Sequence, residues 1–227
     1  MRKAWMIAPI FALGVAAQGN AETPSLAANR CDRACMTALV DQYLAALVKH
    51  DPAGLPLDKG VRFTENTATI HPGDGLWVGA SEAPTTFKIY AFDPATQQIG
   101  FYGVMKGWDK PLIIALRLRV ANGRITEIEH VLARNMRPDR MQNLITPRPG
   151  LLADVPAAER TSREDMLNAA DSYFEAIEQR RGSVAPFADD CERQENGGQT
   201  TYNKTPVPWP VDLGSPRPIA PWRFSEP

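Results

Sequence analysis

The sequence is poor in several informative residue types, and each shortage excludes a class of protein. Its 227 residues include only three cysteines and three histidines, and Cys31 and Cys35 have no second Cys or His pair at zinc-ligand spacing. Acidic and basic residues nearly balance, 26 against 25, so bulk charge does not favour nucleic acid. There is no phosphate loop, GxSxG elbow, HExxH motif or dinucleotide fingerprint. We therefore expect no metal ion, no cofactor and no nucleic-acid partner.

The one long apolar run lies at the N-terminus and indicates an export signal. A basic dipeptide precedes a run from Ala4 to Ala17, and small residues follow at Gly19 and Ala21, which is the pattern of a secretory signal peptide. A membrane anchor is the alternative, but a spanning helix needs about 20 apolar residues and this run is shorter. We expect residues 1–21 to be cleaved, leaving an exported periplasmic or extracellular protein without membrane contact.

Export would place the cysteines in a compartment where disulfides persist. Cys31 and Cys35 are four residues apart. Within a regular helix such a pair has its Cβ atoms about 5–6 Å apart, whereas a disulfide requires about 3.5–4.5 Å. The two can therefore be joined only if they straddle the start of a helix, which would leave Cys191 unpaired.

Hydrophobic periodicity predicts an α+β domain over residues 31–137. Apolar residues at three- and four-residue spacing indicate a helix over 32–49, and a short second helix is expected over 53–58. From Val61 the period changes to two, which is typical of strands. We expect mainly antiparallel strands at 61–65, 86–92, 98–105, 111–120 and 125–132.

The remainder of the chain divides into a linker, a partial repeat and a tail. Prolines punctuate residues 138–161, and Ser162 with Asp165 forms a helix cap. A shift of 130 residues aligns seven identical residues of the first domain with residues 162–196, including Tyr43 with Tyr173 and Glu65 with Glu195. We interpret 162–196 as a partial second copy. Residues 205–227 are rich in proline, which excludes interior strands.

The order of helix, short helix, strand and curved antiparallel sheet resembles the cone of the NTF2-like superfamily, especially its SnoaL-like branch. The resemblance depends on the helix segment 39–47, the strand 61–66 and the run 122–128 leading into the last strand. With its export signal, its Cys31 and Cys35 pair and its paired copies, the chain resembles an exported subfamily of uncharacterised function within this superfamily. The superfamily includes lyases, isomerases and binding modules, so the fold does not define the function.

Three polar residues share a face with apolar neighbours and are therefore expected inside the cone. Tyr43 lies in the apolar stripe of the first helix, while Glu65 and His130 share strand parity with inward apolar residues. Burial would raise the pKa of Glu65 towards that of a general base, and Tyr43 and His130 could donate hydrogen bonds to a developing oxyanion. Arg117 or Arg119 is the expected partner if Glu65 is instead structural.

Ketosteroid isomerase, which resembles this domain, has a first-helix Tyr and an acidic base at the positions of Tyr43 and Glu65. The resemblance implies the same roles here, but the later strand lacks the protonated Asp of that enzyme, since Leu116–Arg119 contains none. Each of the three residues also has a structural interpretation: the Tyr and His as core residues, and the repeated Glu-Asn pair as a device that caps backbone groups.

The loop that follows the first strand is a candidate lid over the cone. Its glycines and Trp77 suit a closing segment, and we expect Asn66, His71, Asp74 and Trp77 to contact a ligand. Two functions remain open. The chain is either a module that binds a small hydrophobic molecule or forms a homodimer through its sheet, or a cofactor-independent lyase or isomerase with Glu65 as base.

Overall fold

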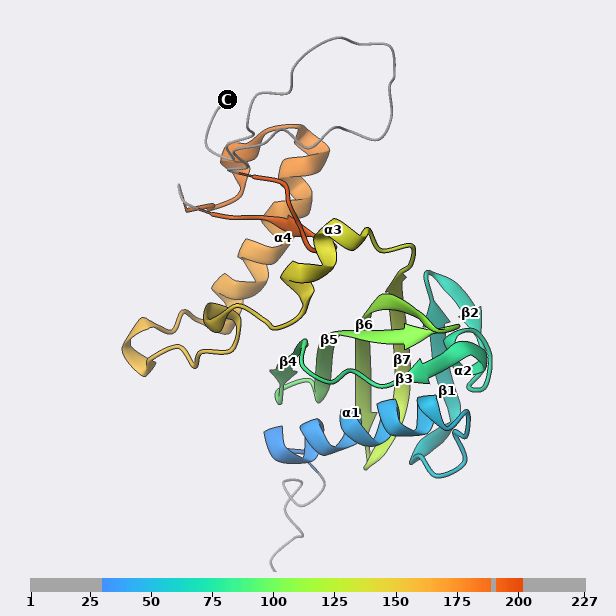
Figure 1. Ribbon diagram of the computed structural model, residues 1–227. Coiled ribbons are helices and arrows are strands. Elements are labelled where there is room, and N and C mark those ends of the chain that lie inside the picture. Colours follow the sequence, from blue (N-terminus) through green and yellow to red (C-terminus); the bar gives the residue numbers. More distant parts are fainter. Residues whose placement is uncertain (1–29, 189–190, 202–227) are drawn as a thin grey trace, which may run out of the picture.

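A curved seven-stranded sheet with a helix across one face forms the centre of the protein. The computed structural model describes residues 30–188 and 191–201. The strand order is β2-β1-β7-β6-β5-β3, and β4 also pairs with β5 (Figure 1). The elements of this domain are α1 (Arg33–Val48), β1 (Leu57–Glu65), β2 (Ala68–Ile70), α2 (Leu76–Gly79), β3 (Ala80–Glu82), β4 (Lys88–Asp93), β5 (Gln98–Gly107), β6 (Lys110–Ala121) and β7 (Arg124–Ala133).

Helix α1 forms where the apolar periodicity predicts it. The Asp32 side chain caps the helix by accepting a hydrogen bond from the Cys35 backbone N–H at 2.9 Å. One stripe of the helix is buried against the sheet, and each large side chain in it contributes about 1.5–3 kcal/mol relative to exposure. The buried residues are Met36, Val40, Tyr43, Leu44 and Leu47.

The disulfide joins Cys31 to Cys35, whose Cα atoms are 5.3 Å apart. Cys31 precedes the capping Asp32 and Cys35 lies in the first turn, so the pair straddles the helix start as geometry requires. The Gln97 side chain accepts a hydrogen bond from the Cys31 N–H at 2.7 Å and donates one to the Cys31 carbonyl at 3.1 Å. The start of α1 is thereby fixed to the turn between β4 and β5.

One expectation about the first domain is wrong, and a second is refined. The segment 53–58 is a turn that runs into a strand and not a helix, because Leu57 already pairs with Ile125 of β7. The sheet is also not wholly antiparallel, since β1 runs parallel to β7 while its other pairings are antiparallel. Local periodicity could not identify either feature, because both depend on pairing with a strand nearly 70 residues further along the chain.

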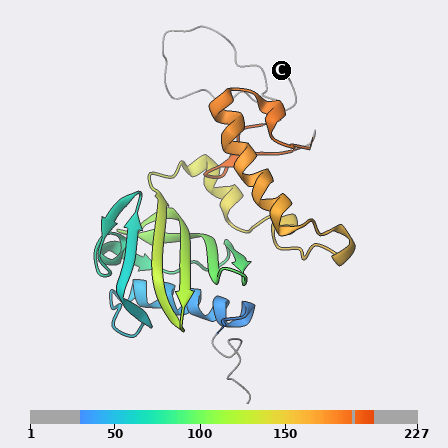
Figure 2. The same cartoon turned by 180° about the vertical axis from the view of Figure 1, so that it is seen from behind.

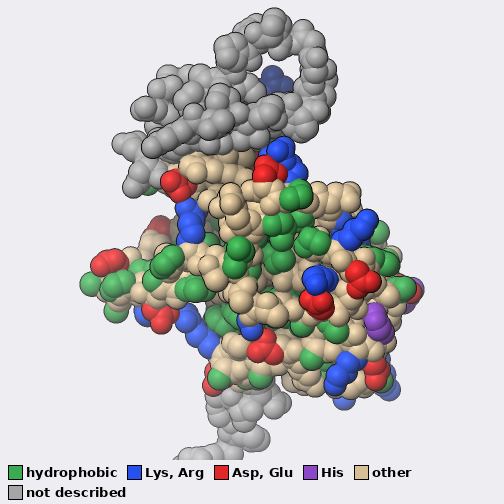
Figure 3. All heavy atoms as spheres, viewed as in Figure 1, with side chains coloured by type: hydrophobic (Ala, Val, Ile, Leu, Met, Phe, Trp, Pro, Cys, Tyr) green, Lys and Arg blue, Asp and Glu red, His purple; other side chains and the backbone are tan. Residues whose placement is uncertain are grey.

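The outer face of the sheet is divided between an apolar and a charged area. Leu144 packs with Phe87 and Ile113 over one part. Over the other, Arg117 bonds Glu127 at 2.9 Å and Glu129 at 2.8 Å. Charged and apolar side chains are interspersed on the face seen in Figure 3.

The linker contains short helical segments, and α4 follows it in a lobe that projects from the sheet (Figure 2). The Ser162 side chain caps α4 by accepting from the Asp165 N–H at 3.0 Å, as predicted. The lobe is tied to the sheet domain by an ion pair between Arg163 and Asp93 at 2.6 Å. Its elements are α3 (Pro138–Met141), η2 (Gln142–Leu144), η3 (Pro149–Leu151), η4 (Ala157–Glu159), α4 (Arg163–Gln179), η5 (Gly182–Val184), β8 (Gln194–Glu195) and β9 (Gly198–Gln199).

Helix α4 carries the same apolar stripe as α1 but exposes it. Phe174, which aligns with the buried Leu44, is 68% exposed, and Met166 and Ile177 are also exposed. None of the helices among the described residues is long and apolar enough to cross a membrane. The predicted signal peptide (1–21) and proline-rich tail (205–227) lie outside the described residues.

The aligned positions Leu44 and Phe174 provide a matched test of this difference. Leu44→Ala removes a side chain that is 3% exposed and should lower the free energy of unfolding by about 2–5 kcal/mol. Phe174→Ala should change it by less than about 0.5 kcal/mol. Urea unfolding measures both, and a comparable loss in the two variants would contradict the structure.

Candidate functional site

Tyr43, His130 and Glu65 meet inside the cone in one hydrogen-bonded row. The Tyr43 hydroxyl lies 2.9 Å from Nε2 of His130, and Nδ1 of that ring lies 3.4 Å from Oε2 of Glu65. On the other carboxylate oxygen, Arg134 donates from Nη2 to Oε1 at 3.1 Å. The three residues singled out from sequence parity are therefore brought together, and a fourth residue joins them.

The parallel pairing of β1 with β7 places the acid opposite the imidazole. Glu65 and His130 are direct partners in that register. Beyond the end of β1, Asn66 continues the contact: its backbone N–H donates to the His130 carbonyl at 2.9 Å, and its side-chain oxygen accepts from the Leu132 N–H at 2.8 Å. Asn66 therefore holds the two strands in register at the site, with its amide occupied by backbone.

The turn before α2 supplies a further donor to the carboxylate. The Leu76 N–H donates to Oε2 of Glu65 at 2.9 Å. This approach requires glycine at position 75, where φ is +63° and a Cβ atom would lie 2.8 Å from the same oxygen. The carboxylate therefore ties β1 to α2, to β7 and to Arg134.

These donors keep Glu65 ionised, contrary to the expected rise in its pKa. Burial raises the pKa of Glu65, but hydrogen bonds from His130, Leu76 N–H and Arg134 outweigh burial and hold the pKa below its ordinary value. Its side chain is only 10% exposed. A carboxylate with these partners is a weak base, because taking up a proton would disrupt an ion pair and three hydrogen bonds.

His130 and Tyr43 are both held neutral. Burial lowers the pKa of His130 more than Glu65 raises it, so the imidazole stays uncharged, with Nδ1–H facing the carboxylate and Nε2 accepting from Tyr43. Burial also raises the pKa of the Tyr43 phenol, which the Trp77 indole opposes and the charge of Glu65 reinforces. Proton positions along the row are thereby fixed.

The candidate lid divides into one buried residue, Trp77, and two exposed residues, His71 and Asp74. Trp77 is 1% exposed and packs edge-on against Tyr43, with ring centroids 5.4 Å apart. His71 and Asp74 are exposed and lie 3.7 Å from each other at the surface. Trp77 therefore belongs to the core, while ligand contact by His71 and Asp74 stays a prediction.

Arg134 is the site residue that sequence reasoning missed. The expected partners Arg117 and Arg119 lie on the outer face of the sheet and bond Glu127. Arg134 continues the inward parity of His130 and Leu132 one step beyond β7. That parity was the available signal, but the strand was expected to end at residue 132.

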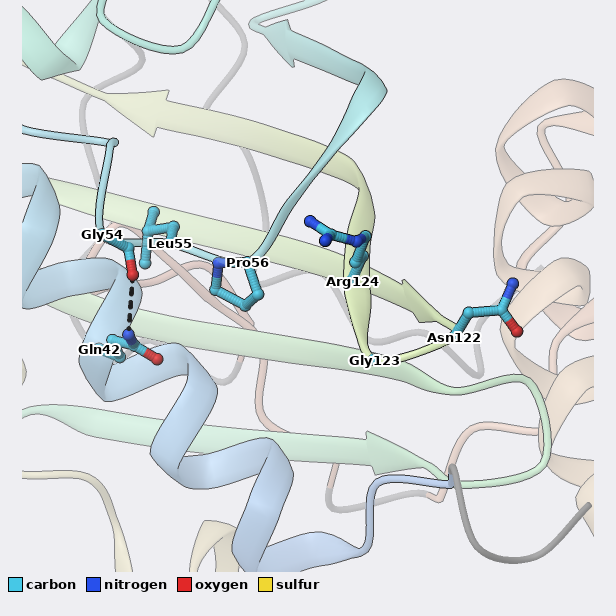
Figure 4. A pocket seen from close by; sticks show the side chains of 7 residues that line it. All are labelled: Gln42, Gly54, Leu55, Pro56, Asn122, Gly123 and Arg124. Carbon is cyan, nitrogen blue, oxygen red and sulfur yellow. Dashed lines mark hydrogen bonds between the residues drawn. The ribbon is translucent and has the colours of Figure 1, made fainter.

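Two surface hollows lie outside the polar row. One hollow of about 510 Å³ is open and lies where β1 and β7 begin, at the opposite end from Glu65; its lining residues are Gln42, Gly54, Leu55, Pro56, Asn122, Gly123 and Arg124 (Figure 4). A smaller hollow of about 80 Å³ is lined in part by Trp108 and Arg134. Neither is lined by Tyr43, Glu65 or His130.

Comparison with known families and curated proteins gives a match to the C-terminal part of the chain. The model of a family described as "Domain of unknown function (DUF8021)" matches residues 159–224, and the search of curated proteins found no match.

NTF2-fold proteins occur among the solved structures similar to this chain. The de novo designed NTF2 fold protein NT-9 is 16% identical, with 51% of this chain and 97% of that one covered and a TM-score of 0.34. A structure described as "putative ketosteroid isomerase from Kribbella flavida DSM 17836" is 16% identical, with coverages of 56% and 93% and a TM-score of 0.35. The sequence identities and TM-scores are low, so the α+β cone is assigned from the helices and strands of this chain itself.

The pKa shifts predict how stability changes with pH. His130 and Glu65 both have lowered pKa values in the folded protein, so the unfolded chain binds more protons than the folded one as pH falls. The free energy of unfolding should decrease below about pH 6.5, where the unfolded His titrates, by up to about 1.4 kcal/mol per pH unit. A second decrease, from Glu65, should begin near pH 4.3.

Urea unfolding between about pH 3 and pH 8 measures both decreases. His130→Gln should flatten the slope between about pH 5.5 and 7 and retain the decrease at lower pH. An unchanged slope near pH 6 in that variant would show that His130 is not the group responsible.

Proposed function

We propose that this chain is a non-catalytic binding and association module built on a closed NTF2-like cone. One observation carries the proposal: Tyr43, His130 and Glu65 are hydrogen-bonded in a largely buried row, and among the described residues the Trp77 Nε1 is the one buried side-chain polar atom without a hydrogen-bond partner. Tyr43 and His130 are fully buried, and the carboxylate of Glu65 accepts hydrogen bonds from three donors of the chain, two on Oε2 and one on Oε1. A buried polar group that is fully paired stabilises a fold and offers no free donor or acceptor to a substrate.

The enzymatic alternative is favoured by a single feature. The row of Tyr43, His130 and Glu65 aligns a phenol, an imidazole and a carboxylate as an acid–base relay does. The low pKa of Glu65 and the lack of a described hollow that reaches it weigh against a lyase or isomerase. A small hydrophobic ligand would accordingly bind at the surface rather than inside the cone.

We also propose that residues 162–196 are a partial second copy of the cone. Several backbone hydrogen bonds recur at the shift of 130 residues: Asp51 N to Ala46 O with Arg181 N to Ala176 O, and Leu55 N to Pro52 O with Ala185 N to Gly182 O. The hairpin recurs too, since Glu195 pairs with Gly198 as Glu65 pairs with Ala68. Unrelated segments would not be expected to share this spacing.

Export and self-association complete the proposal. The Cys31–Cys35 disulfide is consistent with an oxidising compartment outside the cytosol. A homodimer through the sheet would use the charged part of its outer face, because Leu144 and its neighbours cover the rest.

A stability measurement separates the two functions without a known substrate. If the row is structural, Glu65→Gln should lower the free energy of unfolding by about 1–3 kcal/mol, because Arg134 and His130 lose their charged partner. If Glu65 were kept for catalysis at a cost in stability, the same change should leave stability unaltered or raise it.

Glu129→Gln is the matched control. It removes a carboxylate that is 46% exposed and paired to Arg117 on the outer face. Its loss should be less than about 1 kcal/mol, as for other exposed ion pairs. Urea unfolding at pH 7 compares the two variants with the unmodified chain, and an equal effect would contradict the structural role of Glu65.

A further inference from the structure

An aromatic side chain is held in an exposed and unfavourable position at the rim of the cone. Trp108 lies in the two-residue turn between β5 and β6, where Gly107 pairs with Lys110. Its φ is +50° and that of Asp109 is +58°, a conformation that favours Asn or Gly and is unusual for a bulky residue. The Trp108 residue is nevertheless 50% exposed, so burial in the core does not explain its presence there.

The surrounding structure is shaped to hold the ring. A Cβ atom at Gly79 would lie 2.1 Å from the indole, so only glycine allows the ring to rest on this segment. The backbone N–H of Trp108 donates a hydrogen bond to the Gly79 carbonyl at 2.6 Å. The guanidinium carbon of Arg134 lies 5.1 Å from the ring centroid, within the range of a cation–π contact. Backbone strain concentrated around a held side chain is a recognised mark of functional sites.

Two cations face the small hollow beside this ring. The hollow, about 80 Å³ in volume, is lined by Trp108, Lys110, Pro111, Leu112, Arg134 and Asn135, among others. Arg134 directs Nη2 to Glu65 and remains 41% exposed, which leaves other N–H groups for a ligand, since a guanidinium has five. Asn135, at φ +59°, adds an amide next to it. The hollow thus combines positive charge with apolar walls in a space that fits a small group.

We propose that this hollow at Trp108 and Arg134 is a binding site for a small carboxylic acid with a flat apolar body. The carboxylate lies between Arg134 and Lys110, because a guanidinium pairs with a carboxylate through two parallel hydrogen bonds. The apolar body packs on the exposed part of Trp108 and on Pro111. The inference rests on the proposed binding function and assigns it a place and a ligand class.

Benzoate is a suitable probe, and benzamide is its neutral counterpart. Nine heavy atoms in a site of this kind correspond to a dissociation constant of about 1 mM. Titration of the full chain without its signal segment, followed by ¹H–¹⁵N NMR, should shift the Trp108 indole N–H signal with benzoate. Benzamide should bind about tenfold more weakly or not at all, because it lacks the charge.

Variants locate the site. Arg134→Gln and Lys110→Gln should each weaken benzoate binding, the first by about tenfold or more. Arg124→Gln, which alters the larger hollow at the other end of the sheet, should leave the affinity unchanged. Trp108→Asn removes the indole signal, so binding in this variant is followed through the backbone amide signal of Asn135, which also lines the hollow. The variant should lose benzoate binding while keeping or raising the unfolding midpoint, because Asn suits the positive φ of the turn.

The opposite results would overturn the proposal. Equal binding of benzamide, loss of binding in Arg124→Gln, or retained affinity in Trp108→Asn would each exclude a carboxylate site at this rim. A lower unfolding midpoint in Trp108→Asn together with unchanged affinity would assign the ring a structural role. None of these results depends on the stability of the Glu65→Gln variant. The proposed ligand site and the proposed binding function can therefore be contradicted independently of each other.

Discussion

An ionised carboxylate inside an apolar cone must find compensating partners, and the arrangement around Glu65 follows from that constraint. An unpaired charge there would be costly, so donors converge on it from three directions: the imidazole of His130, the backbone of Leu76 and the guanidinium of Arg134. Two of these donors belong to β7 and the residue just beyond it, and the third belongs to the turn before α2. The same contacts therefore join β1, α2 and the end of β7 into one unit, with α1 attached through Tyr43.

The polar groups that remain accessible to a ligand lie at the rim of the cone and not in its interior. The members of the polar row bond one another and are largely buried, whereas the rim keeps an exposed indole and cations that are only partly occupied. Arg134 connects the two regions, since it bonds Glu65 on one side and lies over Trp108 on the other. Strain at Trp108 is tolerated because the ring rests on Gly79 and is contacted by Arg134.

Much of the site could be predicted because side-chain parity is a local property. Period-two alternation placed Glu65 and His130 inward, and helical spacing placed Tyr43 on the same interior. The expected rise in the pKa of Glu65 was wrong because the donors that lower it, His130, the Leu76 N–H and Arg134, reach it from other parts of the chain. The helix expected at 53–58 was wrong for a similar reason, since pairing of Leu57 with β7 overrides the local preference.

The sequence by itself determined the period of most elements, the helix cap at Ser162, and the inward face of the polar residues. These depend on interactions within a few residues of one another. Only the tertiary structure decided which partners the buried acid has and whether an apolar helix face is covered. Two stripes of like composition are buried on α1 and exposed on α4, because burial depends on a sheet that the first helix has against it and the second lacks among the described residues.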